Sequence, residues 1–450
     1  MQDVHEVYCR YCRRVLEGWV EGEPQSHPDC REMVEGNPHV RKILGHIGEE
    51  LYGKTLDELM VSGQLVYEVE EGRVKKLRIE VPVNDELELE SYEKERSSLL
   101  ESYEVEQSSL LENIGVFTDL RELVLVDSVL GSSSEWICRL VNLRRLCLND
   151  SHLTSLSDNF GNLTNLQVLD LGGNELSSLP ESIGLLFKLR NLNLQDNNLT
   201  SLPKSIIRLT NLRELNLDQN QLSSLPENLG NLTGLEILRL CYKNQLSSLP
   251  ESVGRLTNLQ VLGLFDNKLS SLPESVGRLT NLCKLDLGGN KLSSLPESIG
   301  RLINLRNLDL GGNQLSSLPL SLGKLINLEK LCLEDNLLSS LPNCINRLIN
   351  LQELNLDNNQ LSSLPDNFQF PPNLTYLNLD SNQLTSLPES ISCLTNLHFF
   401  SLKNNQLSSL PDSFGNLTKL RDLYLSNNPF SSAPACVEKL WTNGCSIMFN

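Results

Sequence analysis

Leucine recurs along the chain at a nearly constant spacing from residue 120 onward. The residues that open successive units are Leu120, Leu143, Leu166, Leu189, Leu212, Leu235, Leu259, Leu282, Leu305, Leu328, Leu351, Leu374, Leu397 and Leu420, 23 residues apart except for 24 between Leu235 and Leu259. These fourteen units follow the pattern LxxLxLxxNxLSSLPESIGxLTN. Such a period predicts a stack of similar coils, in which each coil buries its apolar side chains against its neighbours.

A single unit shows what each position of the pattern does. After Leu189, the residues Leu192 and Leu194 alternate with polar residues, which predicts a strand whose leucines face a shared core. Asn197 follows where the chain must turn, and its amide can bind backbone groups of adjacent coils. The residues Pro-Glu-Ser-Ile-Gly at 180–184 predict a short helical return. The expected asparagine ladder comprises Asn174, Asn197, Asn220, Asn267, Asn290, Asn313, Asn336, Asn359, Asn382, Asn405 and Asn428, with Ser128 and Ser151 in its place in the first two units.

This pattern resembles the leucine-rich-repeat family, in particular its 23-residue class with the return LPxxIGxLxxL. Ras-suppressor-type scaffolds, the intracellular Ras-group repeats of plants and many bacterial and archaeal repeat proteins are similar. The resemblance implies an α/β leucine-rich-repeat solenoid, with a curved parallel sheet on the concave side and short helical or 3-10 returns on the convex side. It also implies protein–protein binding on the concave sheet.

The repeats divide the chain into five segments. We expect a zinc-binding module at 1–35, a helical cap with a first capping strand at 36–83, an acidic insertion at 84–112, the solenoid of fourteen repeats at 113–428 and a C-terminal cap at 429–450. The capping strand is predicted by Val74, Leu77 and Ile79, because they have the leucine spacing of the repeat.

The insertion contains an 11-residue duplication, ESYEKERSSLL followed by ESYEVEQSSLL. Eleven residues make three helical turns, so Tyr92, Leu99, Tyr103 and Leu110 would share one stripe of a helix. The insertion is then either an acidic, partly helical excursion or decayed repeat, or a docking helix. Charged stretches are usually solvated, which favours the first interpretation.

Charge and cysteine content narrow the class of protein. The formal net charge of −19 and pI of about 4.8 argue against binding to the phosphates of nucleic acids and favour a basic protein partner. No stretch reaches the roughly 18 consecutive apolar residues of a membrane span, and the first residues lack the pattern of a secretory signal. The twelve cysteines are too sparse for a disulfide scaffold. We therefore expect reduced thiols and a cytoplasmic location.

One constellation near the start of the chain has metal-ligand spacing. Cys9 and Cys12 are two residues apart in the manner of a zinc knuckle, and His27 and Cys30 complete a Cys3His set. Four such ligands predict a structural Zn²⁺ ion that stabilises a segment too short to form its own core. The alternatives are four unrelated surface residues, or disulfides in a secreted protein.

A second motif matches a nucleotide-binding pattern without its chemistry. Residues Gly48–Thr55 fit GxxxxGK[ST], but Glu49 and Glu50 would face the phosphates and the surrounding sequence predicts helix rather than a strand before the loop. We therefore expect no nucleotide and interpret the segment as cap helices. In the repeats, His152 and His398 lie far apart, so no catalytic pairing is indicated and we expect no enzymatic activity.

The outward residues of the strands define the expected binding face. Most are acidic or amide residues, which predicts an acidic concave face. The pattern breaks in the 24-residue unit that opens at Leu235. This unit contains Arg239 and Tyr242, and the next unit contains Phe265. Arginine and aromatic residues are typical of interface hot spots, although drift in an unused surface would also explain them. Tyr376, His398, Phe399 and Tyr424 form a weaker second candidate. The proposed binding residues are Arg239, Cys241, Tyr242, Phe265, Asp266, Asp286, Asp309, Asp335 and Asp357.

These observations favour a non-enzymatic scaffold that binds a basic protein surface or peptide on its acidic concave face. The alternative is a recognition or adaptor subunit that recruits a signalling enzyme, such as a small GTPase or a ligase, through its N-terminal module.

Overall fold

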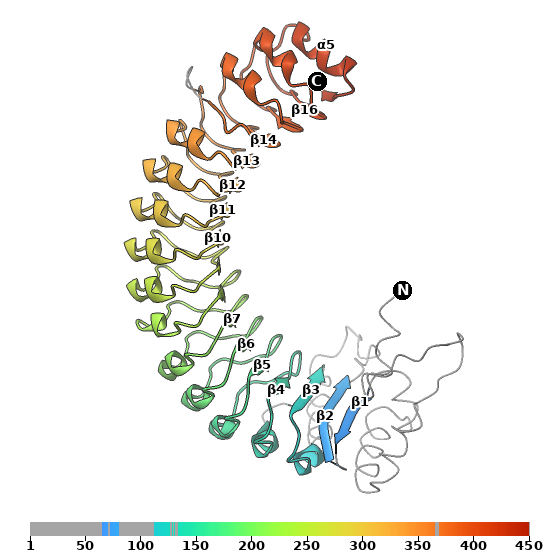
Figure 1. Ribbon diagram of the computed structural model, residues 1–450, viewed down its shortest axis with the longest axis vertical. Helices are drawn as coiled ribbons and strands as arrows, with labels where there is room; N and C mark the ends of the chain where they lie inside the picture. The colour runs from blue at the N-terminus through green and yellow to red at the C-terminus, as the bar shows by residue number, and fades with distance from the viewer. Residues whose placement is uncertain are drawn as a thin grey trace, which may run out of the picture. The chain divides into compact units, whose positions relative to one another are not determined.

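The computed structural model of the chain describes residues 65–70, 73–80, 112–126, 128, 130, 134–364 and 369–449. Two compact units make up the chain, residues 1–212 and residues 213–450, and each is described by itself (Figure 1). No helix among the described residues is long and apolar enough to cross a membrane.

The first unit begins its described part with a hairpin. β1 (Leu65–Glu70) runs antiparallel to β2 (Arg73–Glu80), and β2 pairs in parallel with β3. Parallel pairing continues from strand to strand as far as β6. The remaining elements are β3 (Glu122–Val126), β4 (Arg145–Cys147), β5 (Val168–Asp170) and β6 (Asn191–Asn193), with the 3-10 helices η3 (Glu112–Val116), η4 (Ser134–Arg139), η5 (Asp158–Asn162), η6 (Glu181–Leu185) and η7 (Lys204–Arg208).

The second unit is an uninterrupted run of parallel strands from β7 to β17. Its strands are β7 (Glu214–Asn216), β8 (Ile237–Arg239), β9 (Val261–Gly263), β10 (Lys284–Asp286), β11 (Asn307–Asp309), β12 (Lys330–Cys332), β13 (Glu353–Asn355), β14 (Tyr376–Asn378), β15 (Phe399–Ser401), β16 (Asp422–Tyr424) and β17 (Ser446–Met448). Its helices are η8 (Leu229–Asn231), η9 (Glu251–Arg255), η10 (Glu274–Arg278), η11 (Glu297–Arg301), η12 (Leu320–Lys324), η13 (Asn343–Arg347), η14 (Glu389–Cys393), η15 (Asp412–Asn416) and α5 (Ala435–Thr442).

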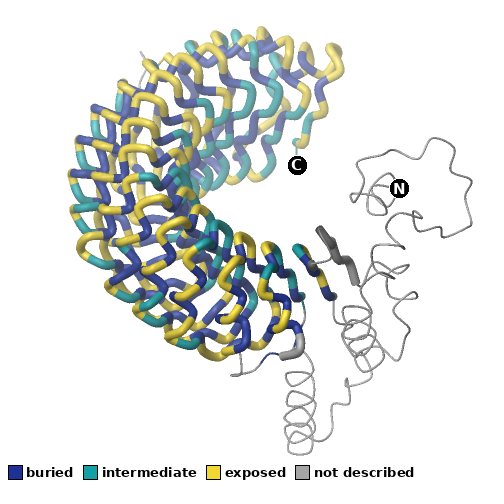
Figure 2. Tube along the Cα trace, turned by 60° about the horizontal axis from the view of Figure 1, so that its bottom comes forward, coloured by how far each residue is buried: buried dark blue, intermediate teal, exposed yellow. Residues whose placement is uncertain are grey.

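The strands and the helices of the second unit lie on opposite sides of its coils (Figure 1). Because every coil but one has the same length, residues 23 apart pair across the sheet, as Lys284 does with Asn307. From β7 to β16, the middle residue of each strand and the leucines on either side of it are fully or almost fully buried, as Leu285 is. Figure 2 shows these buried positions recurring from coil to coil. The second unit is therefore a solenoid of the kind that the leucine spacing predicts, and the described coils of the first unit have the same parallel pairing.

The asparagine ladder joins successive coils inside this core. Asn290 accepts a hydrogen bond from the amide of Leu269 at 3.0 Å and donates to the carbonyl of Leu264 at 2.9 Å, both in the preceding coil. It also donates to the carbonyl of Leu287 in its own coil at 3.0 Å. Ser128 and Ser151, which replace asparagine in the first two units, are fully buried as well. The ladder thus satisfies buried backbone groups that the short strands leave unpaired.

The 3-10 helices stack closely, and glycine makes this possible. In η10, a Cβ atom on Gly277 would lie 2.5 Å from the carbonyl oxygen of Ser298 in the next coil. No side chain fits at that distance, so Gly277 sets how tightly these coils approach. Pro273, the residue just before η10, has an extended backbone.

Residues 429–450 close the second unit. α5 (Ala435–Thr442) packs against η15, and β17 (Ser446–Met448) adds a last parallel strand to β16. The Cys9, Cys12, His27 and Cys30 set, the Gly48–Thr55 pattern and the insertion up to residue 111 lie outside the described residues.

Candidate binding surface on the sheet face of the second unit

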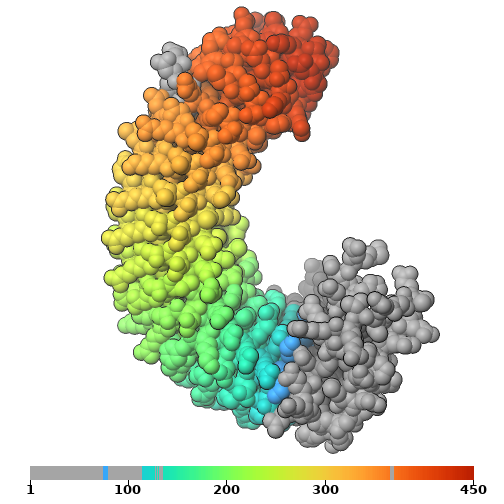
Figure 3. Space-filling view, viewed as in Figure 1, coloured from blue at the N-terminus to red at the C-terminus, as the bar shows by residue number. Residues whose placement is uncertain are grey.

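The candidate site is the outward side of strands β7 to β16, which we call the sheet face. It consists of the first and third residues of each strand, the residue before the strand and the two residues that follow the leucine after the strand. In β13, for example, Glu353 and Asn355 point outward on either side of the buried Leu354. The coils of the second unit are stacked without interruption (Figure 3), so these positions form columns that run across the strands.

Four of the predicted residues gather at β8 and β9. The rings of Tyr242 and Phe265 lie 5.2 Å apart and are tilted by 58°. Tyr242 is 50% exposed and Arg239 is exposed beside it in the same coil, whereas Cys241 is only 9% exposed. Phe265 lies directly over Gly288, where a Cβ atom would be 2.8 Å from the ring. The cluster therefore offers two aromatic rings and a guanidinium, and the Cys241 thiol contributes packing beneath them.

The extra residue of this coil is accommodated by the backbone at 242 and 243. Tyr242 and Lys243 have consecutive positive φ angles of 59° and 55°. Asn244 then takes the ladder position, because it accepts from the amide of Leu222 at 3.0 Å and donates to the carbonyl of Leu217 at 3.0 Å. The sequence analysis missed Asn244. Counting four residues, rather than three, from Leu240 to the ladder asparagine would have found it.

The predicted acidic residues lie on the sheet face in consecutive coils. Asp266 and Asp335 are exposed, and Asp286, Asp309 and Asp357 are half-buried. Burial raises the pKa of Asp286, and the neighbouring Asp309 carboxylate raises it further. Burial likewise raises the pKa values of Asp218, Glu334 and Asp380 on the same face. These carboxylates are therefore less stable in their charged form than carboxylates in water.

Basic residues occupy two columns that the sequence analysis did not consider, namely the residue before each strand and the first residue of the strand. There they form ion pairs with acids of the next coil. These pairs are Arg213 with Glu236 at 2.5 Å, Arg306 with Glu329 at 2.6 Å and Lys330 with Glu353 at 2.8 Å. The sheet face is thus of mixed charge where the strands begin and acidic where they end. Among the described residues, the carboxylates in excess of basic residues lie at the last strand residues and just beyond them.

The second aromatic candidate is a continuous stack. Tyr376 and Phe399 lie on β14 and β15 with ring centroids 4.5 Å apart and planes within 8°. The ring centroids of Phe399 and of Tyr424 on β16 lie 5.3 Å apart, and the Lys403 ammonium lies 4.2 Å from the Tyr424 ring centroid. His398 precedes β15 and is half-buried. Stacked rings on adjacent strands form a rigid apolar platform beside a cation.

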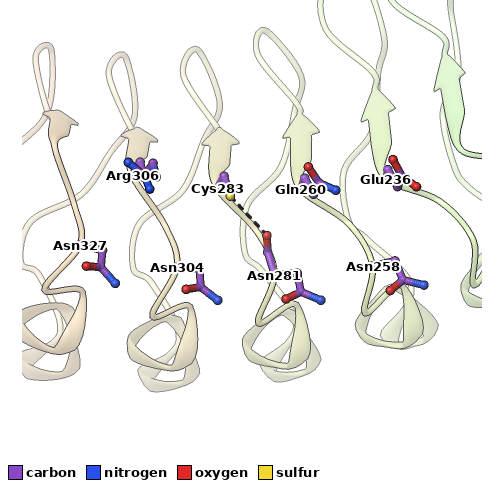
Figure 4. A pocket seen from close by; sticks show the side chains of 8 residues that line it. All are labelled: Glu236, Asn258, Gln260, Asn281, Cys283, Asn304, Arg306 and Asn327. Atoms are coloured by element: carbon purple, nitrogen blue, oxygen red, sulfur yellow. Dashed lines mark hydrogen bonds between the residues drawn. The ribbon is translucent and has the colours of Figure 1, made fainter.

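A shallow hollow of about 500 Å³ follows the beginnings of the strands. It is lined by Glu236, Asn258, Gln260, Asn281, Cys283, Asn304, Arg306 and Asn327. Figure 4 shows the asparagines in one row near the 3-10 helices and the other residues in a second row at the strands. Each asparagine amide donates to a carbonyl of the preceding coil, as Asn304 does to Thr280 at 2.9 Å. The hollow is polar throughout, and its asparagines mainly connect coils.

Comparison with known proteins identifies the class to which this architecture belongs. A model of the leucine-rich repeat region matches residues 96–247, and a model of the leucine rich repeat matches residues 257–315, 326–384, 349–407 and 372–430. A leucine-rich-repeat protein of Leptospira interrogans is 35% identical, with a TM-score of 0.62, and the match covers 75% of this chain and 91% of that one. The chain belongs to the leucine-rich-repeat family.

Two further solved structures share the fold. An internalin of Listeria monocytogenes is 25% identical over 69% of this chain and 87% of its own, with a TM-score of 0.60. A chain from the Toll–Spatzle complex of Drosophila is 26% identical over 76% of this chain and 51% of its own, also with a TM-score of 0.60. No curated protein matches the chain. Solenoids of this kind commonly serve as protein-binding surfaces.

Proposed function

We propose that the chain is a protein-interaction scaffold whose sheet face in the second unit binds a basic segment of a partner protein. In this role the chain holds its partner and catalyses no reaction, and we propose a cytoplasmic location for it. The alternative, recruitment of a signalling enzyme through the residues before 113, rests on the sequence alone.

The observation that carries the proposal is the row of carboxylates at the last strand residues and just beyond them. Asp286, Glu334 and Asp380 have raised pKa values because burial disfavours their charged forms. A partner's lysine or arginine placed among them would stabilise those charges. Because the basic residues of the sheet face are concentrated in the other columns, a basic segment would align with the strand ends. Such complementarity also speeds association and excludes acidic partners.

The two aromatic groups supply anchors near the two ends of this row. Phe265 lies beside β9, and the stack of Tyr376 and Phe399 begins on β14. Five strand spacings separate β9 from β14, which corresponds to about 24 Å. An extended chain covers that distance with about seven residues. A basic segment with an aromatic or apolar residue near each end would therefore fit.

The similar structures are consistent with this role. The Drosophila chain comes from a complex with another protein, Spatzle, and is similar to most of this chain. By analogy with this relative, we propose only that this chain also uses its solenoid to bind protein.

A peptide selection tests the proposal without a known partner. The full-length chain is immobilised and used to select from a displayed library of linear peptides, and affinities of the enriched peptides are measured by fluorescence anisotropy. We expect peptides rich in lysine or arginine, whose affinity falls as salt is added because exposed charges are screened over about 8–10 Å. Enrichment of acidic or uncharged peptides would contradict the proposal.

Two charge-reversed chains then locate the contact. Asp266→Lys with Asp335→Lys changes two exposed acids of the sheet face. Glu274→Lys with Glu297→Lys makes the same change in charge on η10 and η11, on the other side of the coils. We expect the first chain to bind the selected peptides at least about tenfold more weakly and the second to bind them as the wild type does. Equal losses in the two chains would show that only the net charge matters.

A further inference from the structure

Three potential metal ligands come together on β11 and β12. Asp309 and Cys332 are the third residues of these strands and pair directly in the parallel register. Glu334 follows Cys332 by two residues on the same side. One carboxylate oxygen of Asp309, the sulfur of Cys332 and one carboxylate oxygen of Glu334 all lie within 4.8 Å of one another. No other set of three such ligands occurs in the part of the chain that the structure describes.

The polar atoms of this cluster lack the partners that buried groups normally have. Cys332 is 8% exposed and is a free cysteine, so its buried thiol has no disulfide partner. The Oε2 atom of Glu334 is buried and has no hydrogen-bond donor among the described residues. Buried polar atoms without partners are rare and costly. A thiol and a carboxylate aimed at the same point are therefore an indication that something binds there.

Within the described part of the chain, the one base whose charge acts on both Cys332 and Glu334, Lys330, is shared with a carboxylate outside the cluster. Lys330 lies on the same strand, two residues before Cys332, but its ammonium pairs with Glu353 at 2.8 Å. The backbone amide of Gly311 donates to Asp309 at 3.0 Å, which leaves the carboxylate charge in place. The two carboxylates and the thiol thus surround a common point. Among the described residues, no cation lies between them.

A coil of the first unit shows what the same position looks like without these ligands. Cys147 is the third residue of β4, as Cys332 is of β12, and it is 4% exposed. Its neighbour in the preceding strand, the position that Asp309 occupies beside Cys332, is Val124, and Asp170 lies on the following strand. Position 149, which corresponds to Glu334, is Asn. A buried cysteine on the sheet therefore does not by itself make a three-ligand cluster.

We propose that Asp309, Cys332 and Glu334 bind a Zn²⁺ ion on the sheet face of the second unit. A thiolate with two carboxylates suits zinc, whose sites combine sulfur and oxygen ligands in a tetrahedron. With Zn–S near 2.3 Å and Zn–O near 2.1 Å, tetrahedral ligand atoms lie about 3.6 Å apart. On binding, the ligand atoms would close from their present separations of up to 4.8 Å to about that value. On binding, the Cys332 sulfur forms a bond to the metal and releases its proton to solvent, with no change in oxidation state.

This site differs from the predicted N-terminal one, because three protein ligands leave the fourth position of the tetrahedron to a water molecule. It also requires no partner protein, so it stands or falls independently of the proposed function.

Cobalt titration tests the site in the full-length chain. Every chain carries Cys9→Ser, Cys12→Ser and Cys30→Ser, so that the predicted N-terminal ligands add no thiolate signal. Addition of Co²⁺, which substitutes for zinc, should then give a sulfur-to-cobalt charge-transfer band that saturates at about one ion per chain and disappears when Zn²⁺ is added. Circular dichroism checks that each variant keeps its fold.

Three variants assign the ligands. Cys332→Ser should abolish the band, and Glu334→Gln, which keeps the side-chain shape, should weaken cobalt binding at least about tenfold. Cys147→Ser, at the matching strand position, should leave band and affinity unchanged. The proposal is overturned if the parent chain gives no band, if the band survives Cys332→Ser, or if Glu334→Gln binds cobalt as tightly as the parent.

Discussion

Replacing Asn313 by alanine would remove one member of the buried asparagine ladder and is expected to destabilise the coils on both sides. Its side-chain oxygen accepts from the amide of Leu292 at 3.0 Å. Its side-chain nitrogen donates to the carbonyls of Leu287 and Leu310, both at 3.0 Å, and to that of Gly311 at 3.2 Å.

The free-energy cost of this substitution depends on which backbone groups lose their only hydrogen-bond partner. The carbonyl of Leu287 still accepts a hydrogen bond from the side-chain amide of Asn290, and the carbonyl of Leu310 still accepts one from the side-chain amide of Asn336. Only the N–H of Leu292 is left buried with no acceptor. One orphaned donor, with the loss of the shared bonds, should cost about 2–3 kcal/mol. A similar loss is expected at any interior ladder position.

Hydrogen exchange measured by mass spectrometry suits a long repeat array, whose unfolding need not be a single transition. Core amides of the same coils, such as those of Leu287 and Leu310, should exchange roughly 30- to 140-fold faster, because about 1.4 kcal/mol corresponds to a factor of ten. The matched control is Asn304→Ala, which removes one exposed hydrogen bond to the same region and should stay within about 0.5 kcal/mol. Similar exchange in the two variants would refute the argument.

Other substitutions test separate parts of the account. Asp286→Asn should be neutral or slightly stabilising at neutral pH, within about 0.5 kcal/mol, because burial and Asp309 already disfavour its carboxylate. Because the pKa of Asp286 is raised in the folded chain, the folded chain binds protons more tightly than the unfolded one. The wild type should therefore gain stability relative to that variant as the pH falls from neutral. Urea denaturation at several pH values would reveal this trend. Gly277→Ala should lower the urea midpoint by an amount equivalent to about 1–3 kcal/mol, because its Cβ would meet the Ser298 carbonyl; an unchanged midpoint would show that the coils can separate. Cys9→Ser with Cys12→Ser should reduce the zinc content by about one ion per chain, as elemental analysis would show, without altering the thermal unfolding of the solenoid.

The fold follows from the repeat because coils of equal length impose their own register. A spacing of 23 places Lys330 opposite Glu353, and the single spacing of 24 places Ile237 opposite Val261. The sequence therefore predicts the parallel pairing, the buried leucines and the ladder. The hairpin partner β1 (Leu65–Glu70) lies outside the periodic region, so the repeat carries no information about it.

The site is harder to predict because exposure depends on neighbouring side chains as well as on strand position. Cys241 and Cys332 occupy outward positions of the sequence pattern but are buried, since their short side chains lie below longer neighbours. The ion pairs of the first columns depend on side-chain conformations across coils, as that between Arg306 and Glu329 does. The adjacency of Asp309 and Cys332 was available from the register, but the approach of Glu334 required the structure.

Site-specific photo-crosslinking tests most directly whether the sheet face of the second unit is the surface that binds a partner. A photoreactive phenylalanine analogue is introduced into the full-length chain at Tyr242, at Phe399 or at Leu320. The first two positions lie on the sheet face, and Leu320 is 71% exposed on η12 on the other side of the coils. After irradiation in cells that express the chain, the account predicts adducts with the same protein from Tyr242 and Phe399 and none with that protein from Leu320. Adducts with a common protein from Leu320, and none from the two positions on the sheet face, would contradict it.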